Sequence, residues 1–149
     1  MNIKVINHNK EIVRIIINEP KTYNSLSYKN LEDLIITFKK LDKDKKVKVI
    51  ILEGAGKGFS AGHNLKEVKG LKKRNKYQKL FNLCSKLMLQ IVEGRKPVIA
   101  KVHGAAYAAG CQLAASCDLA YSSKDALFAT PGVNIGLFCS TPMLSLIHI

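Results

Sequence analysis

The chain has 149 residues, of which 47% are hydrophobic and 23% charged, and its formal net charge is +13 at pH 7. This length and composition are typical of one globular domain with a hydrophobic core, and they exclude an intrinsically disordered chain. No apolar run has the roughly 20 residues that a membrane-spanning helix needs. The opening MNIKVINHNK lacks the apolar core of a signal peptide. We therefore expect a soluble cytoplasmic protein with no membrane partner, and a mitochondrial location is the alternative.

Strands and amphipathic helices alternate along the chain. Two apolar, β-branched runs at 3–7 and 11–18 flank a polar turn and predict a hairpin. The further predicted elements, in chain order, are a helix capped by Ser27 that reaches Leu41, a strand at 47–52, a helix at 71–92, a strand at 97–103, a small-residue helix at 105–117 and a short strand at 118–122. We expect the apolar stripe of the 71–92 helix, Phe81 included, to pack in the core. This alternation predicts a single α/β domain with parallel strand pairing.

The positive charge comes from 21 Lys and only 3 Arg, and the Lys residues are spread along the chain in local runs. Specific phosphate and base contacts favour Arg, so we expect a solvated basic surface and no nucleic-acid partner. A basic nucleic-acid-binding module stays open as a hypothesis, and it rests on the net charge alone. The four cysteines form no C-x-x-C pair, which indicates reduced thiols and no zinc site.

Two segments poor in side-chain bulk each follow a predicted buried strand. They are FSAGHN at 59–64 and GAAYAAGC at 104–111. In an open α/β sheet the loops at the carboxyl ends of strands form the binding crevice, and small residues let a ligand approach the main chain. Two N–H groups, one from each segment, could bind an oxygen on which negative charge develops, such as a thioester carbonyl turning into an enolate. The alternative is that both segments are close-packed turns between helix and sheet.

These segments resemble a known family. GKGFSAGHNLKE, followed by KPVIAKVHGAAYAAGCQLAASCDLAYSSKDALFATPGVNIGLF, is similar to the enoyl-CoA hydratase/isomerase family, also called the crotonase superfamily. GCQLAASCDLA and FATPGVNIGLFCSTP resemble the branch of it that takes its name from enoyl-CoA hydratase domain-containing protein 3. The resemblance implies a crotonase-like spiral of β-β-α units (the ClpP/crotonase fold), an acyl-CoA thioester as substrate and a homo-oligomer, trimer or hexamer, at full length. It implies no metal or redox cofactor, since coenzyme A enters as part of the substrate.

The resemblance also implies which residues form the site. The two N–H groups of the oxyanion hole fall on His63 and on Ala109. The substrate-binding positions are Ala61, His63, Asn64, Leu65, Lys66 and Ala109.

Two positions depart from the pattern of a hydratase in this family, which uses two glutamates to position and activate water. Gln112 stands at the first glutamate position and Gly132 at the second. Gln112 can orient a water by hydrogen bonding but cannot accept its proton, and Gly132 can do neither. Hydration by the two-glutamate route is therefore in doubt.

Other polar residues near these segments have structural interpretations. The ring of His63 could act as an acid or base, but we expect it to line the pocket. We expect His103 to pack at a strand end, Asp118 to bond nearby backbone, and Tyr107 to pack in the core or line an acyl channel. Ser60 has no positioned base and is no nucleophile candidate.

The resemblance stops near Met143, and the final LSLIHI matches the translated end of a common sequencing adapter. We therefore expect residues 1–143 to be an incomplete acyl-CoA-binding core that lacks the C-terminal helical part, and 144–149 to be a non-native tail. A natural apolar tail is the alternative. The function we expect is an enoyl-CoA hydratase/isomerase-like lyase of fatty acid metabolism that stabilises a thioester enolate, with the fragment itself inactive. The alternative is a non-catalytic acyl-CoA binder or regulator of fatty acid metabolism.

Overall fold

The computed structural model describes residues 2–136. Its strands are β1 (Ile3–Asn7), β2 (Ile12–Ile17), β3 (Val49–Gly54), β4 (Gly58–Ser60), β5 (Val98–Val102), β6 (Ala105–Tyr107), β7 (Leu119–Ser122) and β8 (Leu127–Ala129). Its helices are α1 (Tyr28–Lys43), α2 (Leu65–Gly70), α3 (Arg74–Val92) and α4 (Ala109–Ala115), with 3-10 turns η1 (Pro20–Thr22) and η2 (Pro131–Ile135).

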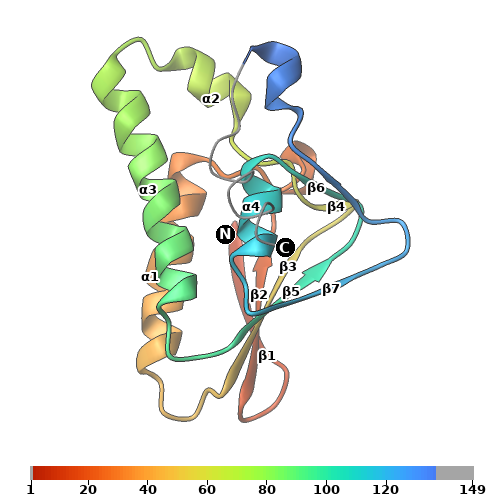
Figure 1. Cartoon of the computed structure of the whole chain (residues 1–149). Helices are drawn as coiled ribbons and strands as arrows, with labels where there is room; N and C mark the ends of the chain where they lie inside the picture. Colours follow the sequence, from red (N-terminus) through yellow and green to blue (C-terminus); the bar gives the residue numbers. More distant parts are fainter. Residues whose placement is uncertain (1, 137–149) are drawn as a thin grey trace.

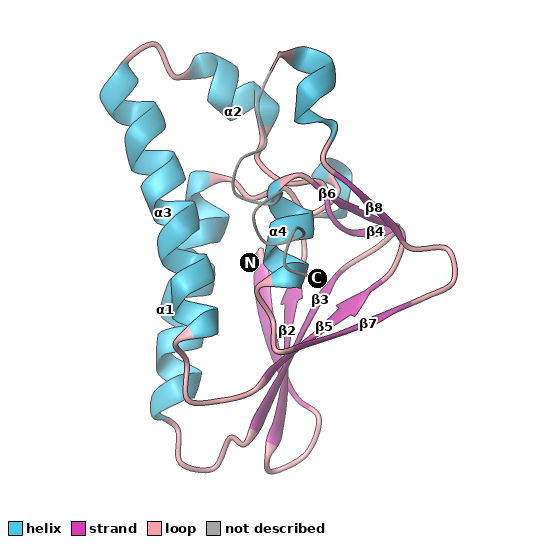
Figure 2. Ribbon diagram, in the orientation of Figure 1, coloured by secondary structure: helices cyan, strands magenta, loops and turns pink. Residues whose placement is uncertain are grey.

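The strands form two sheets, seen in magenta in Figure 2. The larger sheet has the order β1-β2-β3-β5-β7, in which β1 and β2 form the predicted antiparallel hairpin and all other neighbours are parallel. The smaller sheet, β4-β6-β8, is entirely parallel. Each of β3, β5 and β7 is followed along the chain by a strand of the smaller sheet and then by helix or 3-10 turn. This is the predicted succession of β-β-α units.

Helices α1 and α3 run side by side along the larger sheet (Figure 1). The inward residues of β2, namely Val13, Ile15 and Ile17, are buried and form one core with the apolar stripes of both helices. Burial of such side chains stabilises the fold by about 1.5–3 kcal/mol each. The smaller sheet lies against this layer through β4, which contacts β3 and β5.

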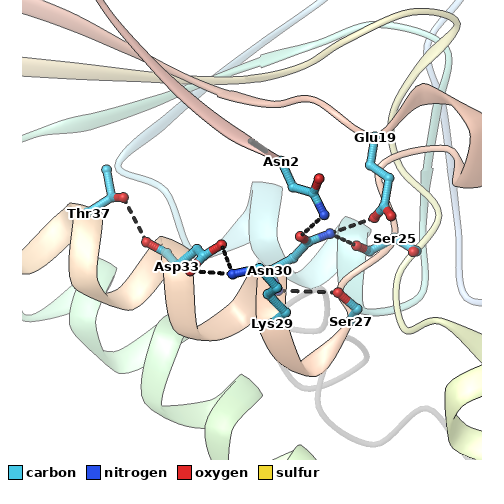
Figure 3. A network of polar contacts seen from close by, with 8 residues as sticks. All are labelled: Asn2, Glu19, Ser25, Ser27, Lys29, Asn30, Asp33 and Thr37. Carbon is cyan, nitrogen blue, oxygen red and sulfur yellow. Dashed lines mark hydrogen bonds and ion pairs between the residues drawn. The ribbon is translucent and has the colours of Figure 1, made fainter.

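The start of α1 is held by side chains. Ser27 is the N-cap, as predicted, and its hydroxyl accepts a hydrogen bond from the Asn30 N–H at 3.2 Å. Asn30 is fully buried, and its amide group donates to the Ser25 carbonyl and the Glu19 carboxylate and accepts from Asn2 (Figure 3). This network joins the first turn of α1 to the segment before it.

Several predicted boundaries were wrong. The helix predicted at 71–92 begins at Arg74, because Leu71 and Lys73 adopt extended backbone and separate it from the short helix α2. Phe81 is 46% exposed and not in the core. The small-residue helix predicted at 105–117 is split into β6 and α4, because residues 105–107 pair with both β4 and β8.

Three thiols, Cys84, Cys111 and Cys117, are free, and Cys139 lies outside the described residues. Within 2–136 no three His, Cys, Asp or Glu side chains are grouped so that they could hold a metal ion. No helix in the same range is both long and apolar enough to span a membrane. The predicted tail at 144–149 also lies outside the described residues.

Candidate functional site

The first predicted loop leaves the end of β4, not the end of β3, because a turn and a three-residue strand intervene. Phe59 and Ser60 of β4 are fully buried, and Gly62 follows with a φ of +84°, a backbone conformation that favours glycine. The Oδ1 atom of Asn64 accepts from the N–H groups of Lys66 and Glu67 and so caps α2. The loop is thus fixed at both ends, by a buried strand and by a helix cap.

The second predicted loop joins β6 to α4. Ala108 has φ 48° and ψ −120°, which is unusual for a residue with a side chain, and its N–H donates to the Ala129 carbonyl at the end of β8. Its own carbonyl accepts from the Gln112 N–H at 3.1 Å. Ala109, the first residue of α4, is buried. Bonds on both sides of Ala108 therefore hold the strained backbone that orients the Ala109 N–H.

The two loops meet at Gly62. A Cβ atom placed on Gly62 would lie 2.9 Å from the Tyr107 carbonyl oxygen and 3.0 Å from the Ala109 backbone nitrogen. The next residue after Gly62 is His63, so the structure brings the two predicted N–H donors into neighbouring positions. Among residues 2–136, neither the His63 N–H nor the Ala109 N–H donates a hydrogen bond to another protein group. Buried or half-buried N–H groups normally have a partner, which makes this pair a candidate binding site for an oxygen.

The imidazole of His63 is half-buried and held from two sides. Its Nδ1 atom lies 3.4 Å from the Leu26 carbonyl oxygen, and since a carbonyl only accepts, Nδ1 carries the proton in that contact. The ring of Phe81 meets it edge-on, with centroids 5.2 Å apart. Burial lowers the pKa of His63 below its usual value, partly offset by the Leu26 bond and the Glu67 charge. The ring is therefore neutral near pH 7.

The two positions that lack glutamates are both buried. Gln112 lies on α4, one turn after the loop, and is 6% exposed. Gly132 is in η2, which follows β8, the strand whose last residue accepts from Ala108. Neither position carries a group that titrates near neutral pH. The arrangement can therefore bind and polarise an oxygen, but these two positions supply no general base.

The remaining predicted site residues lie at the margin of the loops. Leu65 and Lys66 belong to α2 and expose their side chains, so any contact of theirs with a ligand is made from the rim. Ala61 is half-buried, and its N–H donates to the Tyr23 carbonyl at 2.9 Å. That N–H is therefore not available to a ligand.

His103 and Asp118 both bond to backbone, although the partner of Asp118 is not a sequence neighbour. The Nε2 atom of His103 lies 2.8 Å from the Gly56 carbonyl oxygen, at the end of β5. The carboxylate of Asp118 accepts from the Val98 N–H at 2.7 Å, so it ties β7 to β5 across 20 residues and not to its immediate neighbours. Neither residue belongs to the two loops.

Sequence reasoning missed Asn24. This residue is fully buried, its φ is 55°, and its side chain and carbonyl bond both the turn before β4 and Ser60 within it. A signal was present, because YNS places two small polar residues directly before the apolar Leu26, where a turn with a left-handed residue favours Asn.

Comparisons with known proteins show the family to which the chain belongs. The sequence model of the family described as Enoyl-CoA hydratase/isomerase matches residues 7–147. Enoyl-CoA hydratase domain-containing protein 3, mitochondrial, of Xenopus laevis is 45% identical over 142 residues, which are 95% of this chain and 48% of that protein. The chain thus spans about half the length of the curated relatives it matches.

Solved structures show the same relationship. An enoyl-CoA hydratase of Mycobacterium smegmatis superposes with a TM-score of 0.96 at 43% identity, over 99% of this chain and 58% of that one. Human enoyl-CoA hydratase domain-containing protein 3 superposes with a TM-score of 0.94 at 42% identity, over 99% of this chain and 58% of that one. These matches confirm the predicted crotonase fold. The chain belongs to the enoyl-CoA hydratase/isomerase family, the crotonase superfamily, in the branch of enoyl-CoA hydratase domain-containing protein 3.

Proposed function

We propose that this chain is the acyl-CoA-binding core of an enoyl-CoA hydratase/isomerase-like protein. In this proposal the N–H groups of His63 and Ala109 bind the thioester oxygen and stabilise the enolate that forms from it. The observation that carries the proposal is that the two loops meet at Gly62. A Cβ atom placed on Gly62 would lie only 3.0 Å from the backbone nitrogen of Ala109. Fixed backbone N–H groups aimed at a developing oxyanion need no reorganisation during the reaction, and removing one such donor typically costs on the order of 10²–10³-fold in rate.

The proposed chemistry does not include water activation by paired acids. Gln112 can hold a water or a substrate oxygen through its amide, whereas Gly132 has no side chain with which to do so. Hydrogen bonds to the thioester oxygen stabilise an enolate. Hydration and isomerisation of enoyl thioesters have this enolate in common. Which of these follows depends on a base that Gln112 and Gly132 do not provide.

Two substitutions at Ala109 test the proposal. Ala109→Pro removes the N–H donor, whereas Ala109→Gly keeps it. We expect affinity for an acyl-CoA thioester, measured by calorimetric titration, to collapse in the first variant and survive in the second. Ala109 is the first residue of α4, a position at which proline is tolerated, so we expect both variants to fold. Circular dichroism checks this. Equal affinity of two folded variants would remove Ala109 from the site.

A second candidate is a non-catalytic acyl-CoA binder or a regulator of fatty acid metabolism. The presence of Gln112 and Gly132 in place of two acids favours it. The two candidates differ in turnover: a binder retains acyl-CoA unchanged, whereas an enzyme converts it. Chromatography of an enoyl-CoA incubated with the protein separates these outcomes.

Location and assembly are part of the same proposal. Vertebrate relatives such as that of Xenopus laevis have mitochondrial in their names, which supports the mitochondrial alternative over the cytoplasmic expectation. We also propose a homo-oligomer, trimer or hexamer, for the full-length protein.

A further inference from the structure

The segment at 23–26 runs along the whole of the loop that carries His63. The Ala61 N–H donates to the Tyr23 carbonyl at 2.9 Å, and the Leu26 N–H donates to the Gly62 carbonyl at 2.7 Å. The Leu26 carbonyl in turn contacts the His63 ring. Each residue from 61 to 63 therefore has a contact with this segment, so the path of the loop depends on the conformation of 23–26.

That conformation is unusual. Tyr23 and Asn24 have φ of 51° and 55°, so two consecutive residues with side chains lie in the left-handed region. Asn is tolerated there better than most residues, because its short polar side chain bonds locally. Something must hold the pair in place, since such backbone persists only where the surroundings determine it.

Hydrogen bonds of the Asn24 side chain stabilise this backbone conformation. Its Nδ2 atom donates to the carbonyls of Ala55 and Gly58, both at 2.8 Å, and its Oδ1 atom accepts from the Glu19 N–H at 2.9 Å. Its backbone carbonyl accepts from the Ser60 hydroxyl at 2.9 Å. Asn24 is fully buried, and its partners are two residues of β4 (Gly58 and Ser60), Ala55 in the turn before β4, and Glu19 shortly after β2.

Ser60 connects Asn24 to the loop that carries His63. Its hydroxyl donates to Asn24 and accepts from the Gly62 N–H at 3.3 Å. The amide of Asn30 donates to the carbonyl of Ser25, which anchors the other end of the segment on α1 (Figure 3). Hydrogen bonds thus link Asn24 through Ser60 to Gly62, the residue before His63, while Asn30 of α1 holds Ser25, the residue after Asn24.

We propose that Asn24 is a positioning residue for the oxyanion hole. It fixes the segment at 23–26 and, through Ser60, sets where the His63 N–H points. The catalytic meaning of this assignment rests on the proposed function, but the positioning itself is a property of the free protein. Asn24 lies outside both loops and acts on a ligand only through them.

The variant Asn24→Gly tests this without backbone strain, because glycine adopts a positive φ readily while the side-chain bonds are lost. Asn24→Asp, which also loses the two donor bonds but does not gain the flexibility of glycine, separates the two effects. Asn24→Asp keeps the shape and the acceptor for Glu19, but places a carboxylate against two carbonyls. Ile15→Val, in the core of β2, serves as a control that destabilises the fold by loss of packing, away from the loop.

The first measurement is amide hydrogen exchange by NMR in the ligand-free chain. Both measurements use a chain that carries Tyr121→Lys in wild type and in every variant, so that association through the exposed edge strand β7 does not obscure the comparison. In Asn24→Gly we expect exchange of the Ala61 and Leu26 amides to accelerate roughly 10- to 100-fold, since two buried carbonyls lose their donor. The exchange rates of the β3 amides should rise no more in Asn24→Gly than they do in Ile15→Val. Asn24→Asp should give an effect at least as large. Unchanged loop exchange, or acceleration that only follows the global loss seen in Ile15→Val, would overturn the proposal.

The second measurement uses a conjugated aryl-enoyl-CoA thioester, whose absorption moves to longer wavelength when its carbonyl is polarised. The wild-type chain should shift the band, and Asn24→Gly should shift it less at saturating protein while Ile15→Val shifts it fully. An equal shift in wild type and Asn24→Gly also contradicts the proposal. A wild-type chain that binds the thioester without a shift would contradict the oxyanion hole of the proposed function, and hydrogen exchange would still decide the role of Asn24.

Discussion

Replacing Gly110 by alanine perturbs the contact between α4 and β4. A Cβ atom at this position would lie 2.2 Å from the Ser60 carbonyl oxygen and 2.8 Å from the Ser60 Cβ atom. The nearest obstacle is main chain and cannot rotate away, so α4 must move by about 1 Å to restore van der Waals contact. Overpacking of this kind costs about 1–3 kcal/mol. For a chain of this size, that loss lowers the midpoint of thermal unfolding by roughly 3–10 °C.

The same displacement reaches the proposed site, because Ala109 precedes Gly110 and moves with it. A misplacement of about 1 Å can cost on the order of 10²-fold in a reaction that depends on orientation. Gly70→Ala is the matched control, since a Cβ there meets nothing within 4 Å and alanine favours helix over glycine by about 0.5–1 kcal/mol. Thermal unfolding by circular dichroism compares the two. If Gly110→Ala is as stable as Gly70→Ala, α4 does not pack as closely on β4 as we infer. The inferred position of the Ala109 N–H would then also be refuted.

Much of the larger sheet and of α1 could be predicted because local pattern decides them. The β-branched run of β2 and the Ser27 cap each specify their element from a few neighbouring residues. The strands of the smaller sheet could not be predicted in this way. Each has three residues, too few for a period, and β6 forms from alanines that favour helix until pairing with β4 and β8 overrides that preference.

The candidate site was partly predictable for a related reason. The small residues of both loops stand out in sequence, so Ala109 and the residue after Gly62 could be proposed as donors. Their approach in space comes from the parallel pairing of β4 with β6, which no local pattern contains. Asn24 was missed because its role depends on hydrogen bonds to residues more than 30 positions away.

Three further predictions concern turnover, pH and association. The full-length protein should hydrate a short enoyl-CoA more slowly than a two-glutamate relative does, by on the order of 10²–10⁴-fold for each missing acid. Robust turnover of the full-length protein in a spectrophotometric assay would show that another residue supplies the base. Burial lowers the pKa of His63 in the folded chain below its usual value of 6.5, so as the pH falls the His63 ring is protonated first in the unfolded chain. The free energy of unfolding, measured in urea, should therefore fall as the pH drops below about 6.5. His63→Gln should lessen this fall. The last prediction concerns strands β7 and β8, which lie at the edges of their sheets and expose large apolar side chains, namely Leu119, Tyr121, Leu127 and Phe128. Exposed edge strands pair with other chains and exposed apolar patches associate, so the 149-residue chain should form aggregates in sedimentation velocity, and Tyr121→Lys should reduce them. A single monomeric species at micromolar concentration would show that these edges do not drive association.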